Sequence, residues 1–129
     1  MPKIMIAGAG IAGGYLWRLL LKNGISSGDI EVVDPGSSNK CGIPSCGFAT
    51  TKQFLSLCRE VGLEPDKYIL ASPDIEYTNC RKFTVKEHIS SIDKPSFIKD
   101  LLKGAVVNPR PSDVAAERII DATGTARGY

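Results

Sequence analysis

Apolar and polar residues form three successive patterns at the start of the chain. Residues 4–7 are all apolar and precede a glycine, which is typical of a buried strand. Apolar side chains then recur at helical spacing up to Asn23-Gly24, a common helix stop. A second apolar run, Ile30–Asp34, ends at Pro35-Gly36. This order predicts a strand, a helix over residues 11–23 and a second strand, which together form a βαβ unit with a right-handed crossover.

Further short elements are expected after this unit. Residues 35–50 are rich in turn-forming residues and predict a long loop. The other predicted elements are a helix over 51–61, an antiparallel strand pair over 74–78 and 81–85, a helix over 93–104 and strands over 105–107 and 117–121. The fold class is therefore α/β, with a mostly parallel sheet flanked by helices and a small antiparallel pair.

Two of these helices have recognisable sequence signals. The helix over 93–104 has Asp93 as its expected N-cap, a proline in its first turn and Gly104 at its end. For the helix over 51–61, the expected apolar set is Phe54, Leu55, Leu57, Cys58 and Val61.

Three glycines, Gly8, Gly10 and Gly13, form a G-x-G-x-x-G motif between the first strand and the first helix. In dinucleotide-binding folds the first glycine permits the tight turn, the second lets the backbone approach a pyrophosphate, and the third brings the helix close to the sheet. The pyrophosphate lies at the helix N-terminus, beside Ile11 and Ala12 in this sequence, where unpaired N–H groups favour an anion. The motif therefore predicts a dinucleotide site.

An acidic residue at the end of the second strand is the next expected part, because it accepts hydrogen bonds from the adenosine ribose. Glu31 and Asp34 are both candidates, and they point to opposite faces of the strand. Asp34 is preferred because it stands at the carboxyl end, although it could instead initiate the turn at Pro35-Gly36. Either carboxylate would repel a 2′-phosphate, which argues against NADP.

Composition is that of an ordinary globular protein: 43% of the residues are hydrophobic, 23% are charged and the net charge is +2. This charge does not favour a nucleic-acid partner, and Arg18 interrupts the longest apolar stretch, so no membrane span is expected. We expect a cytoplasmic location, since no signal peptide precedes the first strand. The four cysteines lack metal-ligand spacing and His88 has no evident partner, so no metal site or catalytic residue is assigned.

Taken in order, these motifs resemble the N-terminal, FAD-binding part of the geranylgeranyl reductase group, which belongs to the hydroxybenzoate-hydroxylase-like flavoproteins. The resemblance covers nearly the whole chain. It rests on the glycine motif, Asp34, the loop Lys40-Cys41-Gly42, the helix opening at 93–97, and the segment 119–124 with Arg127.

The resemblance implies that FAD is the cofactor. It implies that Asp34 or Glu31 holds the ribose, that Lys40, Cys41 and Gly42 lie near the isoalloxazine ring, with Cys46 as an alternative to Cys41, and that the segment from Asp121 to Gly124 passes beside the pyrophosphate. In that family a substrate-binding domain follows, so residues 1–129 are expected to form a single dinucleotide-binding domain that is not catalytically complete by itself.

We therefore expect a Rossmann-like FAD-binding domain of a flavin oxidoreductase, as a fragment or a partner-dependent form. One alternative is the NAD-binding domain of a dehydrogenase. The other is a non-catalytic nucleotide-binding or interaction module, completed by a second copy of itself or by another chain.

Overall fold

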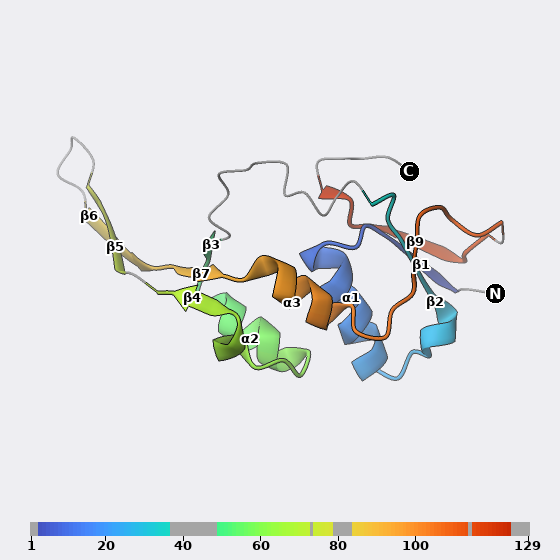
Figure 1. Ribbon diagram of the computed structural model, residues 1–129, viewed down its shortest axis with the longest axis horizontal. Helices are drawn as coiled ribbons and strands as arrows, with labels where there is room; N and C mark the ends of the chain where they lie inside the picture. The colour runs from blue at the N-terminus through green and yellow to red at the C-terminus, as the bar shows by residue number, and fades with distance from the viewer. Residues whose placement is uncertain (1–2, 37–48, 73, 79–83, 114, 125–129) are drawn as a thin grey trace. The chain divides into compact units, whose positions relative to one another are not determined.

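The computed structural model describes residues 3–36, 49–72, 74–78, 84–113 and 115–124 (Figure 1). The chain divides into two compact units, Met1–Pro44 with Ile98–Tyr129, and Ser45–Phe97. The glycine motif and the two candidate acids belong to the first unit. The expected single dinucleotide-binding domain over residues 1–129 stays a prediction, because a division by contacts does not show what each unit binds.

A parallel sheet forms the centre of the first unit, with four strands in the described residues. Their order across the sheet is β8 (Val107–Asn108), β2 (Ile30–Val33), β1 (Ile4–Ala7) and β9 (Arg118–Asp121). At the end of β1, Ala7 lies opposite both Val33 and Asp121. The carboxyl ends of β1, β2 and β9 therefore meet at one edge of the sheet.

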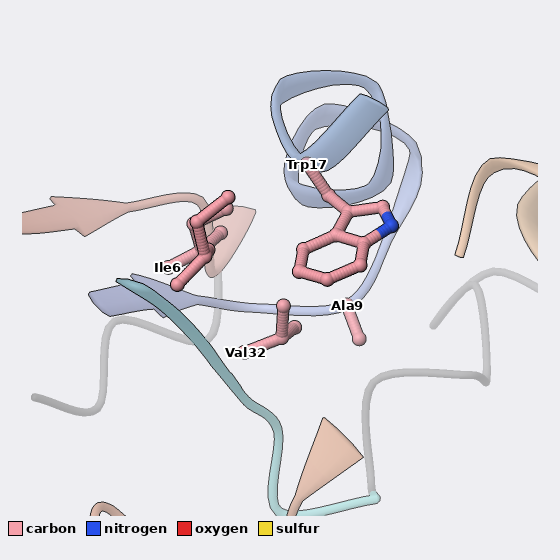
Figure 2. Packing of buried hydrophobic residues seen from close by; sticks show 5 residues of the cluster. Ile6, Ala9, Trp17 and Val32 are labelled. Atoms are coloured by element: carbon pink, nitrogen blue, oxygen red, sulfur yellow. The ribbon is translucent and has the colours of Figure 1, made fainter. Parts of the chain in front are cut away.

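The helix α1 (Ile11–Lys22) packs on one face of this sheet. Its Trp17 is 2% exposed and belongs to a core cluster with Ile6 of β1 and Val32 of β2. Figure 2 shows the indole ring lying over this part of the sheet. The apolar run of residues 4–7 and the apolar residues of β2 form this core because burying their surface removes it from water.

Close helix packing in the first unit depends on Gly14 of α1. A Cβ atom at Gly14 would lie 2.9 Å from the Cβ of Leu101 and 3.4 Å from Cγ of Leu102. Leu101 is the last residue of α3 (Lys94–Leu101) and is fully buried. The glycine therefore lets α1 approach the end of α3 more closely than any other residue would permit.

The second unit contains α2 (Gln53–Glu60) and two small antiparallel sheets. One sheet has the order β3 (Ala49–Thr50), β7 (Ser90–Ile92) and β4 (Ile69–Ala71), and the other pairs β5 (Asp74–Thr78) with β6 (Thr84–His88). Short 3₁₀ turns occupy Ser27–Asp29 in the first unit and Pro65–Lys67 in the second.

Three aromatic rings hold the core of the second unit together. Phe97 meets Phe54 and Tyr68 edge to face, with ring centroids 5.0 Å apart in both pairs. Cys58 is also buried, and burial raises the pKa of its thiol to about 11. The thiol is therefore protonated at neutral pH and packs as a small apolar group.

The expected α/β class, the first βαβ elements and a small antiparallel pair are all present. The helix expected over 11–23 is Ile11–Lys22, and the strand expected over 117–121 is Arg118–Asp121. β3, β4 and β7 were not expected, because strands of two or three residues carry too few positions for a periodic signal.

Several expected boundaries were wrong. The second strand of the pair is Thr84–His88 in the described residues and so extends beyond the expected end at residue 85, because its register pairs Asp74 with His88 and Thr78 with Thr84. Residues 81–83 of the expected strand lie outside the described residues. The strand expected over 105–107 is Val107–Asn108, since these two residues pair with β2. The helix expected over 51–61 is shorter in the structure, where α2 covers Gln53–Glu60. The helix expected over 93–104 is α3, which ends at Leu101.

The expected burial of α2 was also wrong at one position. Leu57 is 44% exposed, whereas Phe54, Cys58 and Val61 are buried. The buried stripe of α2 is thus narrower than the apolar pattern predicts, because Leu57 lies at the edge of that stripe.

Replacing Gly14 by valine should destabilise the protein by about 1–3 kcal/mol, because the new side chain overpacks the contact with Leu101. Urea unfolding followed by circular dichroism measures this change. Ala12→Val, at an exposed position of the same helix, is the control for a β-branched residue and should cost only a few tenths of a kcal/mol. Equal losses in the two variants would contradict the packing role of Gly14.

Asp93 caps α3 as expected. Its Oδ1 accepts a hydrogen bond from the Ser96 N–H at 3.2 Å, and its Oδ2 accepts one from the Ser96 hydroxyl at 2.7 Å. The hydroxyl bond, followed by the backbone bond, lowers the pKa of Asp93. The ionised carboxylate therefore stabilises the folded state, and this contribution is present above the pKa of Asp93 in the unfolded chain.

We expect Asp93→Ala to lower the melting temperature at pH 7. The difference from the unmodified protein should shrink as the pH falls through the lowered folded-state pKa of Asp93, where the carboxylate becomes protonated. Asp93→Asn keeps an acceptor for the Ser96 N–H, so its melting temperature at pH 7 should fall by less than that of Asp93→Ala. Melting curves from pH 7 down to pH 2 test this, and a pH-independent loss in Asp93→Ala would contradict it.

Candidate functional site

The glycine motif forms the turn between β1 and α1, and two of its glycines are required by the packing of the chain itself. Gly8 has φ +111°, and a Cβ atom there would overlap the carbonyl oxygen of Ala122. A Cβ atom at Gly13 would overlap the carbonyl oxygen of Gly8. The exit of β1, the first turn of α1 and the segment after β9 therefore approach one another closely because two side chains are missing.

Gly10 differs from the other two glycines of the motif. Its φ is −82°, which any residue can adopt, and no atom of the described residues lies within 4 Å of the position of its missing Cβ. Gly10 is the N-cap of α1 and supplies no side-chain cap. The N–H groups in the first turn of α1 have no carbonyl partner within the helix. The open space beside Gly10 therefore adjoins hydrogen-bond donors that no side chain caps.

Asp34 links the end of β2 to this glycine turn. Its side chain is 6% exposed, and Oδ2 accepts a hydrogen bond from the backbone N–H of Ala9 at 2.7 Å. Oδ1 accepts one from the N–H of Gly36 at 2.8 Å, so Asp34 also initiates the turn after β2. A carboxylate oxygen can accept more than one hydrogen bond, so these contacts are compatible with a ribose hydroxyl as a further donor.

Glu31, the other candidate acid, contacts a different segment. Its side chain is 7% exposed. Oε1 accepts hydrogen bonds from the Ser112 N–H at 2.8 Å and from Nδ2 of Asn108 at 3.3 Å, and Oε2 accepts one from the Ser112 hydroxyl at 2.9 Å. Glu31 therefore positions the chain after β8. The sequence signal for this role was an acid inside an otherwise apolar strand, since a buried carboxylate needs hydrogen-bond partners.

The segment after β9 turns at the same sheet edge as the glycine motif. The Ala122 N–H donates to the carbonyl of Ala7 at 2.7 Å, and Oδ1 of Asp121 accepts hydrogen bonds from the Thr123 N–H at 2.9 Å and the Thr123 hydroxyl at 2.6 Å. Gly124 follows with φ +66°. Asp121 is exposed, so its carboxylate shapes this turn at the surface.

The structure thus brings together the glycine turn, Asp34 and the segment after β9. Lys40, Cys41, Gly42, Cys46 and Arg127 lie outside the described residues, and their expected roles stay predictions. His88 belongs to β6 of the second unit. In the parts of the chain that are described, no helix has the length and apolar character needed to cross a membrane.

Compared with known proteins, the chain matches no protein-family model and no curated protein.

Replacing Asp34 by alanine should destabilise the protein by about 2 kcal/mol or more, because the buried N–H of Ala9 loses a charged acceptor. Asp34→Asn keeps one acceptor oxygen for the two backbone donors, so its free energy of unfolding should fall by less than that of Asp34→Ala. Urea unfolding of both variants measures the difference. An unchanged unfolding midpoint in Asp34→Ala would contradict the linking role of Asp34.

Proposed function

We propose that the first unit is a Rossmann-like domain that binds the ADP part of an adenine dinucleotide at the glycine turn. The sheet order supports this, because β8-β2-β1-β9 is the order 3-2-1-4 of a dinucleotide-binding sheet when the parallel strands are numbered along the chain. In such sheets ligands bind outside the carboxyl ends of the strands, where the order reverses. That point lies between β1 and β9, at Gly8 and Ala122.

The observation that carries the proposal is the open space beside Gly10. Gly8 and Gly13 are glycines because the chain's own backbone leaves no room for a side chain. Neither conformation nor crowding requires a glycine at position 10. A pyrophosphate that approaches the backbone at this point would require one, since a side chain would occupy its place.

The surrounding groups suit such a ligand. The uncapped first turn of α1, at Ile11, Ala12 and Gly13, offers N–H donors and the positive end of the helix dipole to the phosphates. Asp34 is the proposed acceptor for a ribose hydroxyl. Its negative charge disfavours a 2′-phosphate, so NADP should bind less tightly than NAD.

The choice of FAD, and of a flavin oxidoreductase similar to geranylgeranyl reductases, rests on the resemblance in sequence. When bound, FAD would supply hydride or electron transfer. The residues of this chain would hold its adenosine and pyrophosphate, and the rest of a catalytic site would come from a second copy or another chain.

The test is Gly10→Asn. Asparagine is a favoured N-cap, so this variant should melt at the same temperature as the unmodified protein or higher. The asparagine side chain fills the open space and accepts a hydrogen bond from an N–H group in the first turn of α1, so this donor is no longer available to a phosphate. We expect at least a tenfold loss in affinity for ADP, or about 1.4 kcal/mol, by isothermal titration calorimetry.

Gly24→Asn is the control, because it introduces the same side chain at the opposite end of α1, at a glycine with positive φ and open surroundings among the described residues. Unchanged ADP affinity in folded Gly10→Asn would overturn the nucleotide site. FAD, NAD and NADP are titrated in parallel with the unmodified chain. Binding of NAD without FAD would retain the nucleotide site and reject the flavoprotein assignment.

A further inference from the structure

A cleft lies in the first unit, away from the glycine turn. Its volume is about 370 Å³, which is within the range of small-molecule sites. Within the described residues, its walls include none of the glycines of the motif and do not include Asp34. The lining residues include Ile30, Glu31, Val106, Asn108 and Ser112.

The cleft lies beside the first half of β2, because the edge strand β8 is short. β8 pairs with Val32 and Val33 of β2, whereas Ile30 and Glu31 at the start of β2 have no partner in β8. The chain that leads into β8 turns at Gly104, which has φ +86° and also lines the cleft. The space that a longer strand would fill therefore stays open.

The carboxylate of Glu31 is held at the wall of this cleft. It accepts hydrogen bonds from the N–H of Ser112 at 2.8 Å, from the Ser112 hydroxyl at 2.9 Å and from Nδ2 of Asn108 at 3.3 Å. Glu31 and both donor residues line the cleft. The carboxylate and its donors therefore form one part of the wall, and the position of the carboxylate is fixed before a ligand enters.

Glu31 is a buried charge without a counter-charge. The residue is 7% exposed, and its three donors are neutral groups. Among the described residues, no lysine, arginine or histidine forms an ion pair with it, and it is the single charged residue of the cleft wall. Buried charges in proteins are usually paired, because burial removes the water that would solvate them. The cleft therefore presents a fixed negative charge that the fold itself does not neutralise.

The carboxylate of Glu31 can accept a further hydrogen bond. A carboxylate has about four acceptor positions, and the three donors use Oε1 twice and Oε2 once. A donor that carries a positive charge forms a shorter and stronger hydrogen bond to this group than a neutral donor does. Ile30 and Val106 of the same cleft offer apolar surface to the rest of a ligand.

We propose that this cleft binds a small organic cation whose ammonium or amidinium group donates a hydrogen bond to the carboxylate of Glu31. The cation supplies the missing counter-charge, and the apolar body of the ligand lies against Ile30 and Val106. The same carboxylate repels an anion. This site is independent of the proposed nucleotide site, since Asp34 and the glycine motif do not line the cleft.

Three probes that share one aromatic ring test the charge of the ligand on the unmodified full chain by isothermal titration calorimetry. Benzamidine is a cation, benzamide is a neutral molecule that also carries N–H donors, and benzoate is an anion. We expect benzamidine to bind saturably, benzamide to bind at least about tenfold more weakly, and benzoate not to bind up to its solubility limit. Equal affinities for benzamidine and benzamide would overturn the proposal, and so would benzamidine that does not bind up to its solubility limit.

The second test is Glu31→Gln, which removes the charge and keeps the size and one acceptor oxygen. We expect this variant to lose at least about tenfold in affinity for benzamidine and to bind benzamidine no better than benzamide. Glu117→Gln is the matched control, because it removes the same charge at an exposed position of the first unit that does not line the cleft. Its affinity for benzamidine should equal that of the unmodified chain. Unchanged affinity in folded Glu31→Gln would overturn the assignment of Glu31.

Amide signals of the ¹⁵N-labelled full chain locate the binding site. The signals of Gly28 and Gly104 should move with benzamidine and that of Gly10 should not, because the first two residues line the cleft. Benzamidine binding that leaves Gly28 and Gly104 unmoved would overturn the location. Saturation with ADP should leave the affinity for benzamidine unchanged, and failure of ADP to bind would bear on the nucleotide site alone. If Glu31→Gln does not fold, the three probes and these signals in the unmodified chain decide the question.

Discussion

The close backbone approach at Gly8 is the constraint on which the first unit depends. The carbonyl of Gly8 occupies the position that a side chain at Gly13 would take. The backbone of Ala122 occupies the position that a side chain at Gly8 would take. The exit of β1, the start of α1 and the exit of β9 can therefore meet at one edge of the sheet. A side chain at Gly8 or Gly13 would push these segments apart, so the sheet edge and the helix N-terminus exist as one site only because both residues are glycine.

Two buried carboxylates complete this arrangement by accepting hydrogen bonds from segments that form no strand pairing of their own. Asp34 holds the glycine turn through Ala9, and Glu31 holds the chain after β8 through Ser112. Glu31 lies in β2 and Asp34 follows its last residue, and the two carboxylates bind different segments. Asp34 lies at the edge where the carboxyl ends of the strands meet, whereas Glu31 lies in the first half of β2 and accepts hydrogen bonds from Asn108 and Ser112.

The proposed nucleotide site rests on a residue that the fold itself does not require. Among the described residues, Gly10 has neither the backbone conformation nor the crowding that would call for glycine. In the proposal, the missing side chain at this position is what lets a pyrophosphate approach the backbone.

The sequence by itself determined the local elements: β1, α1 and β2, the cap of α3 at Asp93, and the glycine motif at the joint between strand and helix. Their signals lie within a few consecutive residues, as an unbroken apolar run, a helical repeat or a fixed spacing of glycines. Only the tertiary structure decided what Asp34 and Glu31 bind, which residues of β6 and β8 pair, and that Gly14 lies against Leu101. Glu31 and Ser112 are 81 positions apart, and no local pattern encodes which distant segments meet once the chain has folded.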